Sequence, residues 1–252
     1  MARIAIMGAM AEELHGLHDA MSRVEVISRA GRAFHVGVLD GCEVVLARSG
    51  IGKVAAATTA ALLVDAFGAN RIVFTGVAGG LGAAQVGDIV VADALLQHDM
   101  DASPLFPRYE VPLTGLSRFP ADEALSSALR DAAAAVLQPS HPRAIDHARL
   151  SAFGLGEPRL HRGLVLSGDR FVSSAPESVA LSREFGDALA VEMEGAALAQ
   201  VCHDFGVPFA VMRTVSDRAD DSAHVDFLRF VDEVASHYSV AVVRAMLAAL
   251  AG

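Results

Sequence analysis

Strand-like segments alternate with helical ones along the chain, and this alternation constrains the fold more than any other feature. Short runs rich in β-branched residues recur at 3–7, 24–28, 33–39, 43–50, 71–76, 88–96, 163–168, 188–193 and 209–216. Helical patterns occupy 53–68, 121–137, 176–186 and 195–206, and several end at a glycine, which commonly terminates helices. The early strands cluster together and the later ones alternate with helices, so we predict an α/β fold whose mixed β-sheet is flanked by helices.

One domain, residues 1–252, is expected to hold all of these elements, because 252 residues suffice for a single large core. The last segment carries one apolar helical face that predicts a terminal helix packed on the core: Phe227, Phe230, Val231, Val234, Tyr238, Ala241, Val242 and Ala245. The least regular region, 138–162, is interpreted as a surface excursion. Its histidines, His141, His147 and His161, match no metal-ligand spacing, so we expect no metal.

Composition excludes several classes of function. The formal net charge of −10 disfavours nucleic-acid binding, which requires a basic surface. We find no apolar run long enough to span a membrane, and the apolar opening segment is a better first strand than a signal peptide. The only cysteines, Cys42 and Cys202, suggest no disulfide framework, so we predict a cytoplasmic protein. We also expect that it needs no cofactor.

Two carboxylates interrupt the apolar stretch "ALAVEMEGAALAQVCHDFG" (188–206). An unpartnered buried carboxylate is costly, so a purely structural core is an unsatisfactory explanation for both. If 188–193 is a strand, Glu192 points to the opposite face from Val191 and Met193. Glu194 then lies where the strand gives way to a helix, and ligands bind at the carboxyl ends of strands in open α/β sheets.

Four further segments follow strands. "FTGVAGGLG" (74–82) is glycine-rich but lacks the dinucleotide-binding spacing, and "RSGIGKVAAA" (48–57) lacks the spacing of an NTPase phosphate loop. "GAMAEEL" (8–14) places Glu12 and Glu13 just past the first strand, and "MRTVSDRADDSAH" (212–224) places Ser216 and Asp217 at a strand end. Each segment alone is compatible with a turn or a helix cap. Together they predict one cleft that holds several carboxylates.

Taken in order, "GAMAEEL", "SGIGKVAAA", "TGVAGGLG", "GDIVVAD", "QHDMDAS", "LSGDRFVSS", "VEMEGAALAQVC" and "RTVSDRAD" resemble the 5′-methylthioadenosine/S-adenosylhomocysteine nucleosidases of the nucleoside phosphorylase superfamily. The resemblance covers almost the whole chain. It implies a three-layer sandwich around a twisted mixed sheet. It also implies hydrolysis of an N-glycosidic bond that releases adenine from a 5′-thio-substituted ribose, a step of purine nucleoside metabolism and methionine salvage.

The same resemblance assigns the chemistry. Such cleavage passes through an oxocarbenium-like ribose. Asp217, oriented by Ser216, would act at adenine N7, and its burial near other carboxylates would raise its pKa. Glu13, rather than Glu12, would be the general base that activates water. Glu194 would accept hydrogen bonds from the ribose hydroxyls and favour the developing cation.

The remaining assignments concern substrate binding. By the resemblance, Met193 packs on the ribose, Glu192 supports the site, Phe171 stacks on adenine and Val172 offers it backbone hydrogen bonds. The glycine segment contributes Val77, Ala78 and Gly79, while Met10, Ile51 and Phe227 line the space for the thioalkyl tail. A loop containing Phe106 and Tyr109 would complete the neighbouring subunit's site in a homodimer.

The region 138–162 is longer than the usual family form, and two further departures bear on the substrate. Val77 stands where many members have a small hydroxyl residue, and "SPLFPRYEVPLTG" (103–115) differs near the expected 5′ substituent. The choice among methylthioadenosine, adenosylhomocysteine, 5′-deoxyadenosine and an aminofutalosine-type substrate therefore stays open. A phosphorylase remains an alternative because Arg48 and Arg213 are available to bind phosphate. A non-catalytic nucleoside-binding protein is a more distant alternative, since it needs neither Glu13 nor Asp217.

Overall fold

The computed structural model of the chain describes residues 3–142, 147–219 and 227–251. Within these ranges, eleven strands form one sheet with the order β2-β3-β4-β1-β5-β11-β6-β10-β9-β7-β8. The strands are β1 (Ile4–Gly8), β2 (Ser22–Arg29), β3 (Arg32–Leu39), β4 (Cys42–Arg48), β5 (Arg71–Phe74), β6 (Val77–Gly80), β7 (Ile89–Gln97), β8 (Arg118–Pro120), β9 (Leu160–Ser167), β10 (Ala188–Glu192) and β11 (Phe209–Asp217).

The sheet is mixed, as the sequence predicts. Strands β1, β4, β5 and β11 run parallel to one another, while β2, β3 and β4 form an antiparallel meander at one edge. The long strand β11 pairs first with β5 and then, further along, with β6 and β7. Because β7 also pairs with β9, and β9 with β10, the second half of the sheet curls back on itself. Sequence patterns did not reveal this closure.

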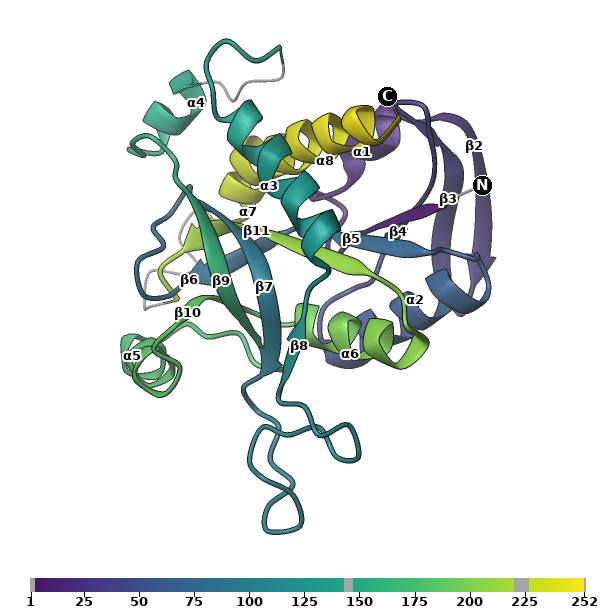
Figure 1. Cartoon of the computed structure of the whole chain (residues 1–252). Coiled ribbons are helices and arrows are strands. Elements are labelled where there is room, and N and C mark those ends of the chain that lie inside the picture. Colours follow the sequence, from purple (N-terminus) through teal and green to yellow (C-terminus); the bar gives the residue numbers. More distant parts are fainter. Residues whose placement is uncertain (1–2, 143–146, 220–226, 252) are drawn as a thin grey trace.

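Helices cover both faces of the sheet (Figure 1). One apolar core lies between the sheet and helices α2 (Lys53–Asp65) and α6 (Gly195–Phe205). The other lies under α1 (His15–Ala20), α3 (Glu123–Val136) and α8 (Ser236–Ala251). A smaller cluster includes residues of α5 (Ala175–Glu184). The arrangement is the helix–sheet–helix sandwich that the family resemblance implies.

The C-terminal segment begins as α7 (Phe227–Phe230), continues through a π-helical turn η1 (Val231–Ala235) and ends as α8. By length and composition alone, the helical segment 227–251 is long and apolar enough to span a membrane. The sequence-based expectation that no apolar run reaches this length was therefore wrong. The inner residues of this segment are nevertheless buried in the fold, among them Tyr238, Val242 and Met246. This packing is that of a core helix, as the periodicity of its apolar residues predicts.

Several elements differ from the sequence-based expectation. The glycine-rich segment, which was compatible with a turn, contains β6. The elements β8, α1 and α4 (His147–Ala152) were not predicted. The predicted excursion 138–162 contains α4 and the start of β9, with residues 143–146 outside the described ranges. Leu150 of α4 is buried, and the ring of Phe153 contacts that of Phe230. The segment is therefore partly regular and partly packed on the terminal helix.

Candidate active site

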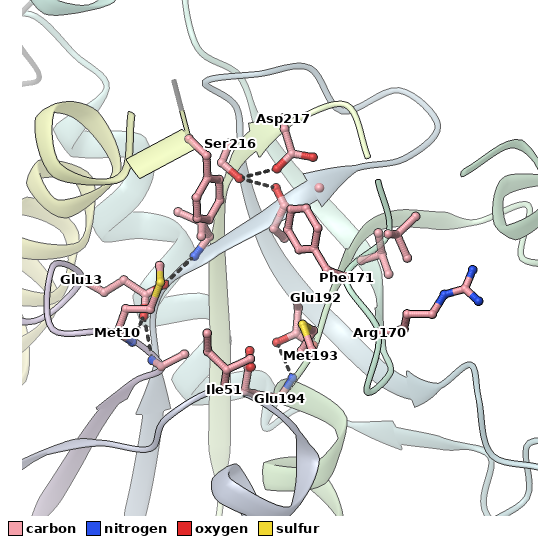
Figure 2. Close-up of a pocket in the computed structure, with 17 residues that line it drawn as sticks. Met10, Glu13, Ile51, Arg170, Phe171, Glu192, Met193, Glu194, Ser216 and Asp217 are labelled. Atoms are coloured by element: carbon pink, nitrogen blue, oxygen red, sulfur yellow. Dashed lines mark hydrogen bonds between the residues drawn. The ribbon is translucent and has the colours of Figure 1, made fainter. Parts of the chain in front are cut away.

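A pocket opens where the carboxyl ends of several strands meet (Figure 2). Its walls come from the turn after β1, the turn after β4, strand β6, the loop after β9, and the ends of β10 and β11. This is the position at which open α/β sheets bind ligands. It is lined by Ala9, Met10, Glu13, Ile51, Val77, Ala78, Gly79, Arg170, Phe171, Val172, Val191, Glu192, Met193, Glu194, Ser216, Asp217 and Phe227.

Glu13 lies in the turn between β1 and α1, not in the first turn of a helix. One carboxylate oxygen accepts hydrogen bonds from the backbone N–H groups of Ala9 (2.7 Å) and Met10 (2.9 Å), and the other from that of Val77 (3.1 Å). Burial raises the pKa of Glu13, while these hydrogen bonds and the charge of Arg213 oppose the rise. A side chain at Gly76 would lie 2.7 Å from the carboxylate, so this glycine makes room for Glu13.

Glu192 is a structural anchor with many partners. Its oxygens accept hydrogen bonds from the Ser167 hydroxyl, from the backbone N–H of Gly195 (2.8 Å) and from the guanidinium of Arg213 (2.7 Å). Arg213 is only 1% exposed and lies over the ring of Phe74, 4.0 Å from its centre. Both charges are thus buried and paired, which explains one of the two carboxylates that interrupt the apolar stretch.

Glu194 precedes the first residue of α6 and accepts a hydrogen bond from the backbone N–H of Gly52 (2.8 Å), in the turn after β4. It is 6% exposed, and this burial, together with the nearby charge of Glu192, raises the pKa of Glu194 to about 8. The second carboxylate is therefore held at the pocket wall at considerable electrostatic cost. A bound ligand that donates hydroxyl hydrogen bonds to Glu194 would offset part of that cost.

Ser216 and Asp217 end β11 on another side of the pocket (Figure 2). The Ser216 hydroxyl donates to an Asp217 oxygen (2.8 Å) and also lies 3.3 Å from the backbone oxygen of Ala78. The other Asp217 oxygen accepts from the N–H of Ala219 (2.7 Å). Both residues are only 8% exposed. A buried carboxyl oriented in this way is suited to exchanging a proton with a bound ligand.

Apolar side chains complete the pocket. Phe171, 44% exposed, meets Phe227 edge to face, with their ring centres 6.1 Å apart. Met10, Ile51 and Met193 lie around the same space (Figure 2). A flat ring and a short apolar chain would both find matching surfaces here.

The structure brings all but two of the predicted site residues to this one pocket. Phe106 and Tyr109 lie instead in the long connection between β7 and β8, which projects from the body of the molecule (Figure 1). There the Tyr109 hydroxyl donates to Glu184, and the Tyr109 ring packs against Phe185.

Three lining residues were not predicted: Ala9, Val191 and Arg170. Ala9 and Val191 each lie next in sequence to a predicted site residue, so their place in the pocket could have been inferred from the sequence. Arg170 points away from the pocket in Figure 2 and forms an ion pair with Glu177, so only its proximity brings it into the lining.

In the described part of the chain, no group of three or more His, Cys, Asp or Glu side chains is placed to hold a metal ion. Of the histidines considered for that role, His161 pairs with Asp88 (2.7 Å). Cys42 and Cys202 are free thiols.

Comparison with known proteins places this geometry in context. The sequence matches the phosphorylase superfamily over residues 3–248. It is 37% identical to a 5′-methylthioadenosine/S-adenosylhomocysteine nucleosidase of Chromohalobacter salexigens, over 98% of this chain and 97% of that one. The fold is similar to the nucleosidase of the same name from Neisseria meningitidis, solved with methylthio-immucillin-A (TM-score 0.85, 33% identity, 99% and 100% coverage). It is also similar to a futalosine hydrolase mutant of Helicobacter pylori (TM-score 0.82, 32% identity, 98% and 99% coverage).

The paired burial of Glu192 and Arg213 predicts a large loss of stability when one partner is removed. Arg213→Met leaves the Glu192 carboxylate buried without its counter-charge, and we expect the free energy of unfolding to fall by about 3–5 kcal/mol. Chemical denaturation measures this change. The double variant Arg213→Met/Glu192→Gln should regain part of the loss, and a double variant less stable than the single one would contradict the pairing.

The raised pKa of Glu194 predicts a pH-dependent stability. The pKa of Glu194 is about 8 in the folded chain and returns to the ordinary glutamate pKa of 4.5 in the unfolded chain, so stability falls as pH rises between these two values. Glu194→Gln keeps the acceptor for Gly52 but has no proton to lose. We expect this variant to exceed the wild type by roughly 1–3 kcal/mol at pH 8 and to match it near pH 4.5.

Thermal unfolding of the ligand-free protein across this pH range tests the expectation. Glu25→Gln, at an exposed position on β2, is the matched control for loss of one carboxylate. A stability gap that is independent of pH would contradict the assignment to Glu194.

Proposed function

Since the chain belongs to the phosphorylase superfamily, and within it to the 5′-methylthioadenosine/S-adenosylhomocysteine nucleosidase family, we propose that it hydrolyses the N-glycosidic bond of 5′-methylthioadenosine and S-adenosylhomocysteine. The products are adenine and the 5-thio-substituted ribose. One observation carries the proposal: three buried carboxyl groups, Glu13, Glu194 and Asp217, line one pocket together with an aromatic ring and apolar tail-binding surfaces.

Departure of adenine is assigned to Asp217. As the bond between ribose C1′ and adenine N9 breaks, electron density moves into the purine, and a proton or strong hydrogen bond at N7 lets the base leave neutral. The burial of Asp217 and its contacts with Ser216 and Ala219 support this role, because they fix the carboxyl group without exposing it to solvent.

Attack by water is assigned to Glu13. The water oxygen forms the new bond to C1′, and Glu13 takes the proton that the water loses. The raised pKa of Glu13 supports a basic role, since a carboxylate in water is a weak base. Its backbone hydrogen bonds hold the carboxylate in one orientation, which reduces reorganisation during the reaction.

Ribose recognition is assigned to Glu194 and Met193, with Glu192 in support. The 2′ and 3′ hydroxyls would donate to Glu194, and these hydrogen bonds favour its ionised form. The resulting negative charge stabilises the oxocarbenium-like ribose of the transition state. Glu192 acts indirectly by fixing the first residues of α6.

Adenine binding is assigned to Phe171, Val172 and the strand formed by Val77, Ala78 and Gly79. Phe171 would stack on the purine, and Val172 would offer backbone hydrogen bonds. At Gly79 a side chain would come within 3.1 Å of an Asp217 oxygen, so glycine leaves the catalytic acid accessible to the base. Met10, Ile51 and Phe227 would receive the thioalkyl tail.

Phosphorolysis is disfavoured by the surroundings of Arg48 and Arg213, the two arginines considered as phosphate-binding residues. Arg213 is buried against Glu192, and Arg48 is not part of this pocket's lining. The carboxylate of Glu13 would repel phosphate at the attacking side. A nucleosidase acting on another 5′-substituted adenosine remains the second candidate, supported by the similarity to the futalosine hydrolase of Helicobacter pylori.

Assembly as a homodimer is part of the proposal. The connection that carries Phe106 and Tyr109 projects from the fold, and Leu105 and Leu113 in it are 84% and 92% exposed. Apolar side chains displayed in this way are suited to insertion into a second subunit. The cytoplasmic location is proposed on the two free thiols, Cys42 and Cys202.

Adenine release tests the function directly. We expect the protein to release adenine from both substrates in phosphate-free buffer and to form the free 5-thioribose, as detected by chromatography of both products. Release that requires phosphate and forms a ribose 1-phosphate would replace the hydrolase with a phosphorylase. Tight binding of both nucleosides without release would instead identify a nucleoside-binding protein.

Asp217→Asn is the sharpest test of the catalytic assignments. Asparagine retains an acceptor for Ala219 and an amide that can donate to the Ser216 hydroxyl, so the fold should be kept while the acid is lost. We expect kcat to fall by about 10²–10⁴. Glu13→Gln should show a similar loss, with a stability cost of about 1 kcal/mol because its amide faces a backbone N–H. Near-normal turnover by either variant would remove that residue from its role.

A further inference from the structure

A second and larger pocket, of about 860 Å³, adjoins the first. Ala9, Met10 and Ile51 line both pockets. Since Met10 and Ile51 are assigned to the tail of the substrate, a substituent long enough to extend past them has access to this outer pocket. The outer pocket takes its other walls from the turn after β1, the end of β4 and the hairpin between β2 and β3.

The outer pocket has two arginines, Arg32 and Arg48, against one carboxylate, Glu12, although the whole chain carries a formal charge of −10. Within the described ranges, Arg48 has no hydrogen bond or ion pair with another side chain. Arg32 donates to the backbone oxygen of Ala30 (2.9 Å), but its Nε is buried and has no acceptor in the described structure.

A buried donor without an acceptor is costly, and guanidinium groups favour carboxylates, which they bind with two parallel hydrogen bonds. His35, which also lines the outer pocket, has a buried ring nitrogen, Nδ1, without a partner among the described residues. Burial and the neighbouring His18 lower the pKa of His35, so a neutral ring is available as a further hydrogen-bond donor.

From this arrangement we infer that the outer pocket binds a carboxylate at the far end of the substrate's 5′ substituent, through Arg32 and Arg48. The inference rests on the proposed nucleosidase function and narrows its substrate class. The preferred substrates are adenosines whose 5′-thioether chain ends in a carboxylate, and 5′-methylthioadenosine, which leaves the outer pocket empty, is the poorer substrate.

Two sources of such a carboxylate are chemically distinct. The chain of S-adenosylhomocysteine ends in an amino acid, whose ammonium group would meet Glu12 in the same pocket. A simple alkyl carboxylate has no ammonium and needs only the arginines. The choice between them depends on Glu12, so a variant at this residue separates the two.

The test compares kcat/KM for three substrates: 5′-methylthioadenosine, S-adenosylhomocysteine and 5′-S-(3-carboxypropyl)-5′-thioadenosine. We expect Arg48→Met and Arg32→Met each to lower kcat/KM for the two carboxylates by about five- to twentyfold, mainly through KM. Turnover of 5′-methylthioadenosine should change less than twofold. Arg23→Met, which removes an exposed arginine of β2 outside the pocket, should affect none of the three.

Glu12→Gln identifies the source. If this variant lowers kcat/KM for S-adenosylhomocysteine alone, the pocket recognises an amino acid. If kcat/KM changes equally for S-adenosylhomocysteine and the carboxypropyl nucleoside, the pocket recognises the carboxylate alone. Both results agree with the inference. Raised ionic strength should weaken the preference for carboxylates, because the arginine groups are partly open to solvent.

Other outcomes overturn the inference. Equal losses on all three substrates would mean that the arginines only support the fold, and no loss on any would mean that the outer pocket is not used. If the wild type releases adenine from none of the three, the proposed function itself fails. Equilibrium binding then decides about the outer pocket, and equal affinity for 5′-methylthioadenosine and the carboxypropyl nucleoside would overturn the carboxylate site.

Discussion

The buried ion pair between Glu192 and Arg213 holds the pocket together. Through Glu192 it joins the ends of β9 and β10, the first backbone N–H groups of α6, and β11. Glu194 follows Glu192 by two residues, and Asp217 follows Arg213 by four, so the positions of both depend on this pair. Buried ion pairs contribute little net stability when compared with apolar packing. The value of this one lies in fixing two chain segments that carry the proposed chemistry.

The electrostatics of the pocket follow from the same arrangement. Arg213 is the positive charge that partly offsets the burial of Glu13 and Glu194. Glu192 forms the direct ion pair with Arg213. The negative charge of Glu192 also disfavours ionisation of Glu194. In the absence of substrate the burial of Glu13 and Glu194 therefore disfavours their ionised forms, and the pocket is prepared for a ligand that supplies hydroxyl donors and develops positive charge. This is the pattern expected when polar groups are organised before the reaction rather than during it.

Much of this organisation was predictable from the sequence, and the limits have physical causes. Glu194 and Asp217 were recognisable as candidates because carboxylates at the ends of apolar strands stand out from the apolar pattern, whereas the choice of Glu13 over Glu12 came from the family resemblance. The partner of Glu192 was not recognisable, since a contact between Glu192 and Arg213 depends on which strands become neighbours. Strand β6 was missed because the segment is rich in glycines, which are typical of turns. Gly76, just before the strand, makes room for Glu13, and Gly79 within it makes room for Asp217. The outer pocket was missed because Arg32 and Glu12 come together only through the hairpin and the turn after β1.

The position of β11 in the sheet has a consequence for how the protein is made. This strand lies between β5 and β6, which are close neighbours in sequence and precede β11 by about half of the chain. The two halves of the sheet thus remain separated until the last strand inserts between them. A growing chain on the ribosome cannot acquire a working pocket gradually, because the segment that carries Asp217 is also the one that joins the halves. Contacts so distant in sequence favour slow, cooperative folding, and activity should emerge in a single late step of biosynthesis.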